Sequence, residues 1–222
     1  MTYLFSLLEK LATLWIARSA QPSRARQGKK NALTPSVVIT GGGSGIGFAL
    51  AEEFSARGDT VVLIGRQEGR LKTAARDLNH KYGNRVLSLA LDIAQDSAAE
   101  ILERWLSLEG LYCDVLVNNA GIGLSGSFLK SDRKDLDQVL AINMKSLTLL
   151  TRAFLPSMIE RGRGGMINIG SLGGAVPGPY QAIYYATKAY VLSFTEAVAS
   201  EISGLGVRMC VVLPGPVETR FH

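Results

Sequence analysis

The sequence has few of the side chains that build disulfide frameworks or metal centres. Its 222 residues include only two cysteines and two histidines. Cys113 and Cys210 lie far apart without metal or redox spacing, so we predict thiols in the core of a protein from a reducing compartment. His80 and His222 fall outside any ligand spacing, and we predict no metal site.

The chain also lacks any excess of charge beyond its first residues. The whole net charge of +5 falls within residues 1–34, and the rest of the chain holds eighteen basic and eighteen acidic side chains. Because nucleic-acid binding needs a basic face, a neutral body argues against nucleic acid as the main partner. The length suits one α/β domain with a substantial core and is too short for two.

No apolar run is long enough to cross a membrane. The first apolar segment, residues 2–17 (TYLFSLLEKLATLWIA), falls short of the roughly 20 residues that a bilayer requires, and Lys10 interrupts it. Leu4, Leu7, Leu8, Leu11 and Trp15 recur at helical spacing ahead of a basic linker, residues 18–34. Two alternatives stay open: a helix lying on an anionic membrane surface, or a helix packed on the body or on a partner subunit.

From Pro35 onward, short β-branched runs alternate with longer helical patterns. This alternation predicts an α/β protein with a Rossmann-type, doubly wound parallel sheet in three layers, helix–sheet–helix. The expected strands are 36–40, 60–64, 85–91, 114–118, 165–170 and 207–213. The expected helices are 45–57, 68–81, 97–109, 132–160 and 182–203, the third supported by a capping box at Ser97 and Glu100.

The first expected strand runs directly into a glycine-rich turn, Thr40-Gly41-Gly42-Gly43-Ser44-Gly45-Ile46-Gly47. Glycine permits positive φ angles and lets the backbone approach a ligand closely. The helix that follows would direct its free N–H groups at a phosphate. The alternative is a turn without a ligand, but its place between strand and helix favours phosphate binding.

The T-G-x-x-x-G-x-G spacing resembles the cofactor turn of the short-chain dehydrogenase/reductase family. Further signatures follow in the family's order: Asn118-Asn119-Ala120-Gly121 after the fourth strand, Asn143 within a helix, Ser171 thirteen positions before Tyr184-x-x-x-Lys188, and Pro214-Gly215 after the sixth strand. The resemblance spans roughly residues 36 to 220 and implies hydride transfer between a nicotinamide cofactor and a carbonyl or alcohol substrate. The cofactor-binding residues that we expect are Gly41, Gly43, Ser44, Gly45, Ile46, Gly47, Arg66, Asp92, Asn119, Ala120, Gly121, Tyr184, Lys188, Pro214, Gly215, Val217 and Thr219.

Tyr184 and Lys188 have a chemical relationship that follows from their spacing. Four residues apart on a helix, their side chains share one face about 5–6 Å apart. A free tyrosine has a pKa of about 10, and an ammonium about 4 Å away would lower it by some three units at an effective dielectric near 20. We therefore expect Tyr184 to act as the acid–base, against the alternative of a half-buried aromatic side chain.

The family resemblance implies the other catalytic roles. Ser171 would orient the carbonyl oxygen, Lys188 would also hold the nicotinamide ribose, and Asn143 would hold a water that relays protons to Lys188. Without the resemblance, we would expect the Ser171 hydroxyl to cap a turn. Asn143 would then indicate a helix kink or an interhelical hydrogen bond.

Cofactor choice depends on the end of the second strand. An acidic residue there would accept the ribose hydroxyls of NAD, but the sequence has Gly65-Arg66, and Asp59 lies at the opposite end of the strand. A guanidinium suits a 2′-phosphate, so we expect NADP(H). The alternative is a solvated surface arginine. Asp92 resembles the family's adenine-contacting acid, or caps the following loop.

The chain ends at His222, where members of the family normally continue with substrate-covering helices and a seventh strand. We therefore expect an extension (1–34) and an oxidoreductase domain (35–222) that is C-terminally incomplete, either a fragment or a shortened member with its sixth strand as an exposed edge.

A homodimer or homotetramer built on helices 132–160 and 182–203 is expected. The expected location is cytoplasmic, with or without peripheral contact at the inner face of a membrane. The alternative function is a non-catalytic NADP(H)-binding scaffold or sensor.

Overall fold

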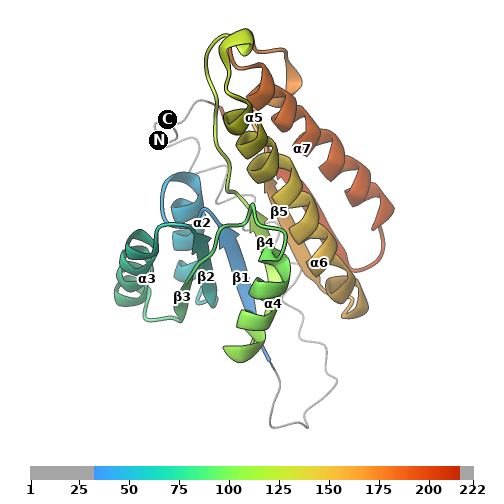
Figure 1. Cartoon of the computed structure of the whole chain (residues 1–222). Coiled ribbons are helices and arrows are strands. Elements are labelled where there is room, and N and C mark those ends of the chain that lie inside the picture. The colour runs from blue at the N-terminus through green and yellow to red at the C-terminus, as the bar shows by residue number, and fades with distance from the viewer. Residues whose placement is uncertain (1–32, 216–222) are drawn as a thin grey trace.

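A six-stranded parallel sheet forms the centre of the part of the chain that the computed structural model describes, residues 33–215 (Figure 1). Its strands, in chain order, are β1 (Thr34–Thr40), β2 (Val61–Gly65), β3 (Val86–Ala90), β4 (Leu111–Asn118), β5 (Gly164–Ile169) and β6 (Val207–Val212). Their spatial order is β3-β2-β1-β4-β5-β6, and every pair is parallel. The order reverses between β1 and β4, which is the switch point of a doubly wound sheet.

Helices cover both faces of this sheet, so the fold has the predicted three layers (Figure 1). On one face lie α2 (Gly45–Ala56) and α3 (Glu68–Tyr82). On the other lie α4 (Ala98–Leu108), α6 (Leu147–Glu160) and α7 (Ala182–Glu201), with α5 (Arg133–Leu140) leading into α6. The prediction of a Rossmann-type α/β fold is therefore confirmed.

The central strands β1, β2, β4 and β5 carry apolar runs because both of their faces are buried. In β1, Val37 and Ile39 belong to the core beneath α2 and α3, whereas Val38 belongs to the core beneath α4 and α6. Each fully buried aliphatic side chain contributes about 1.5–3 kcal/mol of transfer free energy. The two cores hold the sheet rigid, and the functional residues project from its edge.

The long helix predicted over 132–160 is divided in the structure. A π-helical segment, Ala141–Ser146, separates α5 from α6. Within it, the buried Asn143 side chain bonds the backbone of Ile122, so a tertiary contact accompanies the wider turn. The predicted capping box at Ser97 is wrong, because α4 begins at Ala98 but the Ser97 side chain makes no capping bond.

Several predictions concern residues outside those that the structure describes. They include the amphipathic segment in residues 1–32, together with Val217, Thr219 and His222. Among residues 33–215, no helix has both the length and the apolar character needed to cross a membrane. Within the same range Cys113 and Cys210 are free thiols, the first buried and the second half-buried.

Candidate active site

The candidate site lies where the parallel strands end. Because β1 to β5 run in one direction, the residues that follow them gather at one edge of the sheet. Gly41 follows β1, Arg66 follows β2, Asn119 follows β4 and Ser171 follows β5. Residues that the sequence separates by up to 130 positions therefore share one edge of the fold.

The glycine-rich turn has the geometry predicted for a phosphate site. Gly41 has a φ of 66°, a backbone angle that residues with a side chain rarely adopt. A Cβ at Gly47 would overlap the Gly41 carbonyl oxygen, so the turn closes tightly on its own helix. The helix α2 begins at Gly45, and the exposed Ser44 makes no side-chain bond to its first N–H groups. Those N–H groups can therefore bind an anion. The side chain of Ile46 packs on the core instead.

Thr40, which we did not predict as a site residue, joins the glycine-rich turn to the end of β4. Its buried hydroxyl accepts from the N–H groups of Asn119 and Ala120, both at 3.0 Å, and donates to Val117 O at 3.2 Å. Asn119 Nδ2 donates in return to Thr40 O at 2.8 Å. The sequence signal for Thr40 was its position at the start of the T-G-x-x-x-G-x-G motif. Its three hydrogen-bond partners could not be read from the motif, because they depend on the pairing of β1 with β4.

Arg66 and Asp92 lie at the same edge, after two adjacent strands. In the ladder Gly65 pairs with Ala90, so both residues follow the ends of paired strands. Arg66, the first residue after β2, is exposed, whereas Asp59 lies before that strand, as predicted. One oxygen of Asp92 accepts from Ala94 N at 3.1 Å, so this residue does cap its loop.

Four predicted catalytic residues come together beside this edge. Lys188 Nζ donates to Ile169 O at 2.8 Å and lies 5.7 Å from the centroid of the Tyr184 ring. The Tyr184 hydroxyl is hydrogen-bonded to that of Ser171. Ser171 also accepts from Gly173 N at 3.1 Å, so its hydroxyl caps a turn and faces Tyr184 as well.

Asn143 completes the group from the opposite side. A point corresponding to a Cβ on Gly121 would lie 3.3 Å from Asn143 Oδ1 and 3.5 Å from Lys188 Nζ. The absence of a side chain at Gly121 therefore leaves the space in which these two polar groups face each other. Asn143 itself exchanges two hydrogen bonds of 2.9 Å with the backbone of Ile122.

The predicted lowering of the Tyr184 pKa is wrong for this structure. Burial raises the pKa of the Tyr184 phenol above its ordinary value, the bond from Ser171 lowers it by less, and Tyr185 raises it further. The Lys188 ammonium lies over the ring and is bonded to Ile169 O. Burial also lowers the pKa of Lys188 itself to about 8. The groups that shift the Tyr184 pKa are therefore burial, Ser171 and Tyr185, and the expected effect of Lys188 is not among them.

Pro214 and Gly215 lie against the loop after Ser171, where Leu172 N donates to Pro214 O at 3.2 Å. The end of β6 thus reaches the same region as predicted. Within residues 33–215, no group of three or more histidine, cysteine, aspartate or glutamate side chains has the geometry to hold a metal ion.

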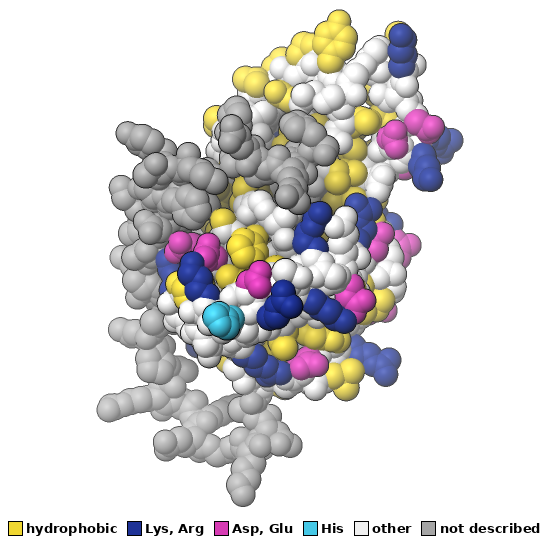
Figure 2. All heavy atoms as spheres, turned by 90° about the vertical axis from the view of Figure 1, so that its left-hand side faces the viewer, with side chains coloured by type: hydrophobic (Ala, Val, Ile, Leu, Met, Phe, Trp, Pro, Cys, Tyr) yellow, Lys and Arg dark blue, Asp and Glu magenta, His cyan; other side chains and the backbone are white. Residues whose placement is uncertain are grey.

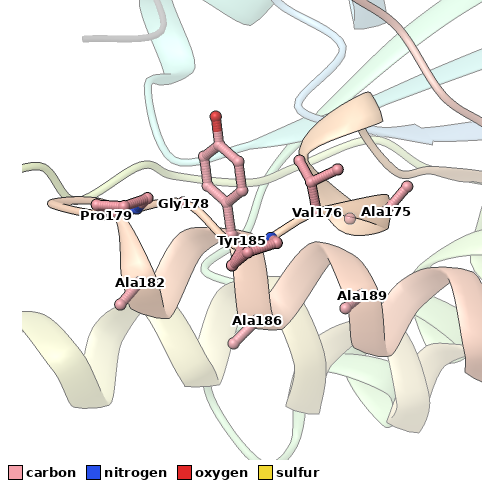
Figure 3. A pocket seen from close by; sticks show the side chains of 10 residues that line it. Ala175, Val176, Gly178, Pro179, Ala182, Tyr185, Ala186 and Ala189 are labelled. Carbon is pink, nitrogen blue, oxygen red and sulfur yellow. The ribbon is translucent and has the colours of Figure 1, made fainter.

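A cavity of about 620 Å³ lies on a different face of α7. Ala182, Tyr185, Ala186 and Ala189 line it together with the loop 174–179 (Figure 3). These four recur at helical spacing on one face, and at about 100° per residue Tyr184 and Lys188 lie on a neighbouring face. Tyr185 also packs edge-on against Tyr184, with ring centroids 6.0 Å apart, so the cavity borders the catalytic group.

Comparisons with known proteins agree with this arrangement. The sequence profile described as short chain dehydrogenase matches residues 35–222. The very-long-chain 3-oxoacyl-CoA reductase of Rattus norvegicus is 35% identical over 188 residues, which cover 83% of this chain and 60% of that reductase. The chain thus spans less than two thirds of the length of this relative.

Two solved structures have the same fold. A short-chain dehydrogenase from Sphingobium yanoikuyae in complex with NADPH is 35% identical with a TM-score of 0.79, covering 84% of this chain and 73% of that one. L-Sorbose reductase from Gluconobacter frateurii, complexed with NADPH and L-sorbose, is 32% identical with a TM-score of 0.79, covering 86% and 73%. On the fold, the ordered motifs and these matches together, the chain belongs to the short-chain dehydrogenase family.

Proposed function

We propose that the chain is an NADP(H)-dependent oxidoreductase that transfers a hydride between the cofactor and a carbonyl or alcohol carbon. The observation that carries this proposal is the meeting of Ser171, Tyr184, Lys188 and Asn143 at the sheet edge that also carries the glycine-rich turn. The relatives described above are named for reactions, so they give the non-catalytic alternative no support.

The residues present fit a dinucleotide phosphate. The tight Gly41–Gly47 turn and the uncapped start of α2 would hold the pyrophosphate. Arg66, which makes no ion pair with another side chain among residues 33–215, would bind the 2′-phosphate. The backbone at Asn119 to Gly121 and the loop at Pro214-Gly215 would border the nicotinamide side. When bound, the nicotinamide supplies or accepts the hydride.

The chain's own residues would then manage the proton. Tyr184 Oη donates it to the carbonyl oxygen in reduction and accepts it in oxidation. Ser171 orients that oxygen, because its hydroxyl already faces Tyr184. The high pKa of Tyr184 suits a group that must be protonated before it acts as an acid. Lys188, next to Gly121 and Asn143, holds the ribose and replaces the proton.

An apolar rim beside the site supports a substrate with a sizeable apolar part. It consists of Phe128, Leu129, Leu172, Val176 and Tyr180, all more than half exposed. Leu172 directly follows Ser171, and Gly126 N donates to Tyr180 O at 2.7 Å, which joins the two loops that carry the rim. Figure 2 shows hydrophobic side chains gathered at the upper end of the molecule, the end reached by the chain between β4 and α5 in Figure 1.

The test is oxidation of NADPH, followed by absorbance, with a series of unbranched methyl ketones and with polar hydroxyketones. Each methylene group that becomes buried adds about 0.8 kcal/mol, so kcat/KM should rise about fourfold per carbon while the rim is being covered. Reduction of hydroxyketones alone would contradict the apolar substrate. Failure to reduce any carbonyl, with NADPH bound, would contradict the oxidoreductase proposal.

Two further proposals concern the setting of the protein. The alanine-lined cavity on α7 and the outer surface of α6 suit self-association into a homodimer or homotetramer. The basic, amphipathic extension suits loose attachment of a cytoplasmic protein to anionic membranes. Co-sedimentation of the full chain with anionic but not neutral vesicles is expected on that basis.

A further inference from the structure

Thr187, one of the three residues between Tyr184 and Lys188, has a fully buried side chain. Its hydroxyl donates to Tyr184 O at 2.7 Å and accepts from Asn143 Nδ2 at 3.0 Å. A hydroxyl has one hydrogen, and here it is used within α7, so Thr187 can meet Asn143 only as an acceptor. Thr187 thereby joins the first turn of α7 to the π-helical segment Ala141–Ser146.

The Asn143 side chain depends on this acceptor. One of its two amide hydrogens goes to Ile122 O, and the other goes to Thr187 Oγ1. Its oxygen accepts from Ile122 N and also faces the space beside Gly121 that Lys188 Nζ borders. Removal of the Thr187 hydroxyl would leave one buried N–H group without a partner, and the side chain would then turn or the two helices would separate.

Another threonine on α7 makes the same pair of contacts away from the site. Thr195 is 1% exposed, donates to Val191 O and accepts from Asn168 Nδ2 at 2.9 Å. Asn168 lies in β5 and is bonded in turn by Asn118 at 2.9 Å. Because the hydrogen bonds and the burial of the two threonines match, a substitution of Thr195 measures what a buried, doubly bonded threonine on α7 contributes to stability alone.

We infer that Thr187 is a positioning residue for the catalytic pair. Its buried hydroxyl fixes the start of α7 against Asn143, which sets where Lys188 Nζ and the Tyr184 hydroxyl lie relative to a bound dinucleotide. It acts through Asn143 and the Tyr184 carbonyl and touches neither substrate nor cofactor. The part of this inference that concerns turnover rests on the proposed function, whereas the part that concerns cofactor binding does not.

The experiment compares Thr187→Val and Thr187→Ser with Thr195→Val in the full chain. NADPH affinity is measured by the quenching of tryptophan fluorescence. The values of kcat and KM are measured with the ketone that is reduced best, and the melting temperature is measured by circular dichroism. Thr187→Val should weaken NADPH binding by at least about threefold and lower kcat by at least about tenfold, with KM for the ketone changed by less than about threefold. Thr187→Ser, which keeps the hydroxyl, should restore both values to within about twofold of the original.

Thr195→Val should lower the melting temperature as much as Thr187→Val while NADPH affinity and kcat stay within about twofold of the original chain. Equal effects of the two valine variants on affinity, or no effect of either, would overturn the inference. If the original chain binds NADPH but reduces no carbonyl, the proposed function fails, and the affinity comparison still decides the role of Thr187. Thr187→Ala and Thr195→Ala form a second pair, to which the same criteria apply if a valine variant does not fold.

Discussion

Lys188 Nζ lies over the ring of Tyr184, 5.7 Å from its centroid, and gives a hydrogen bond to Ile169 O at 2.8 Å. The ammonium is thus held by the end of β5. Tyr184 takes its hydroxyl contact from Ser171 instead. On the proposed function, these two neighbours of the phenol would have different roles: Ser171 would align the substrate oxygen, and Lys188 would provide a polar group behind the ring.

Tyr184→Phe should abolish carbonyl reduction, because it removes the hydroxyl that transfers the proton and leaves the ring in place. NADPH affinity should stay within about twofold, since a single lost hydrogen bond of a half-exposed group contributes little to binding. Tyr190→Phe is the matched control, because the Tyr190 hydroxyl on the same helix is hydrogen-bonded to Thr148 and not to the catalytic group. Residual activity of Tyr184→Phe above a few per cent would remove the acid–base assignment.

Lys188→Met should stabilise the protein at neutral pH, and the gain should shrink at alkaline pH. Burial lowers the pKa of Lys188 from 10.5 in the unfolded chain to about 8. Between these values the unfolded chain binds more protons, so the original protein gains stability as the pH rises. Below about pH 8 the cost of burying the ammonium, up to about 3 kcal/mol, is fully present.

Urea unfolding at pH 7 and pH 9.5 measures this difference. The control is Lys72→Met, since Lys72 is exposed and paired with Glu68 on the surface of α3. A Lys188→Met difference that does not change between the two pH values would show that the lysine titrates alike in the folded and unfolded chains.

Arg66→Asp should move cofactor preference from NADP(H) towards NAD(H). A carboxylate repels the 2′-phosphate and accepts the ribose hydroxyls, and one charge-assisted bond of about 1.5–3 kcal/mol corresponds to roughly ten- to a hundred-fold. Titrations with NADPH and NADH give the ratio of dissociation constants. Arg76→Asp, further along α3, is the control and should leave this ratio unchanged. An unaltered ratio for Arg66→Asp would show that Arg66 is a surface arginine without a role in cofactor choice.

Gly47→Ala should prevent binding of the dinucleotide while the fold survives. The added methyl group would overlap Gly41 O and approach Asn119 Nδ2, so the turn must open. Gly69→Ala in α3 meets no atom within 4 Å and should leave binding intact. Fluorescence titration with NADPH and a thermal melt separate the two effects. Binding by Gly47→Ala at the original affinity would show that the closed turn is not required.

We expect the chain to self-associate through α6 and α7, which lie within the helices expected at 132–160 and 182–203. Leu149 is 40% exposed on α6, and exposed alanines line the cavity on α7. Ala186→Glu would place a charge in that cavity and should yield a monomer by light scattering at micromolar concentration. Ala56→Glu, at the end of α2 on the opposite layer, is the control. A monomeric mass for the original chain would contradict the prediction.

The strands and most helices were predictable because their patterns are local. Apolar runs of β-branched residues predicted the ends of β1 and β2 to within two residues. The helical patterns predicted the ends of α2 and α3 equally well. The break at Ala141–Ser146 was foreseen only as the alternative of a helix kink at Asn143, since it accompanies bonds from Asn143 to Ile122, 21 positions earlier. Local sequence carries no sign of such a contact.

The site shows the same division. Motif spacing placed Ser171, Tyr184, Lys188 and Asn143 together, but not the direction of the Lys188 side chain, on which the Tyr184 pKa depends. Thr187 gave no signal, because a threonine inside a helix is as compatible with a solvent-facing position as with a buried bond. Distances and burial, which decide chemical behaviour here, arise from packing between elements.

The Thr40 hydroxyl has a consequence for how this protein can change. It binds the glycine-rich turn to Asn119 and Ala120, and Gly121 then borders Lys188 Nζ and Asn143. If the proposed function holds, the glycine-rich turn and the catalytic group are linked through this short stretch of backbone, so a substitution in the turn should alter cofactor affinity and rate together. Arg66 has no hydrogen bond to this unit among the residues described. Selection for a different nucleotide can therefore act at Arg66 while the chemistry stays intact, which makes the periphery of the site its adaptable part.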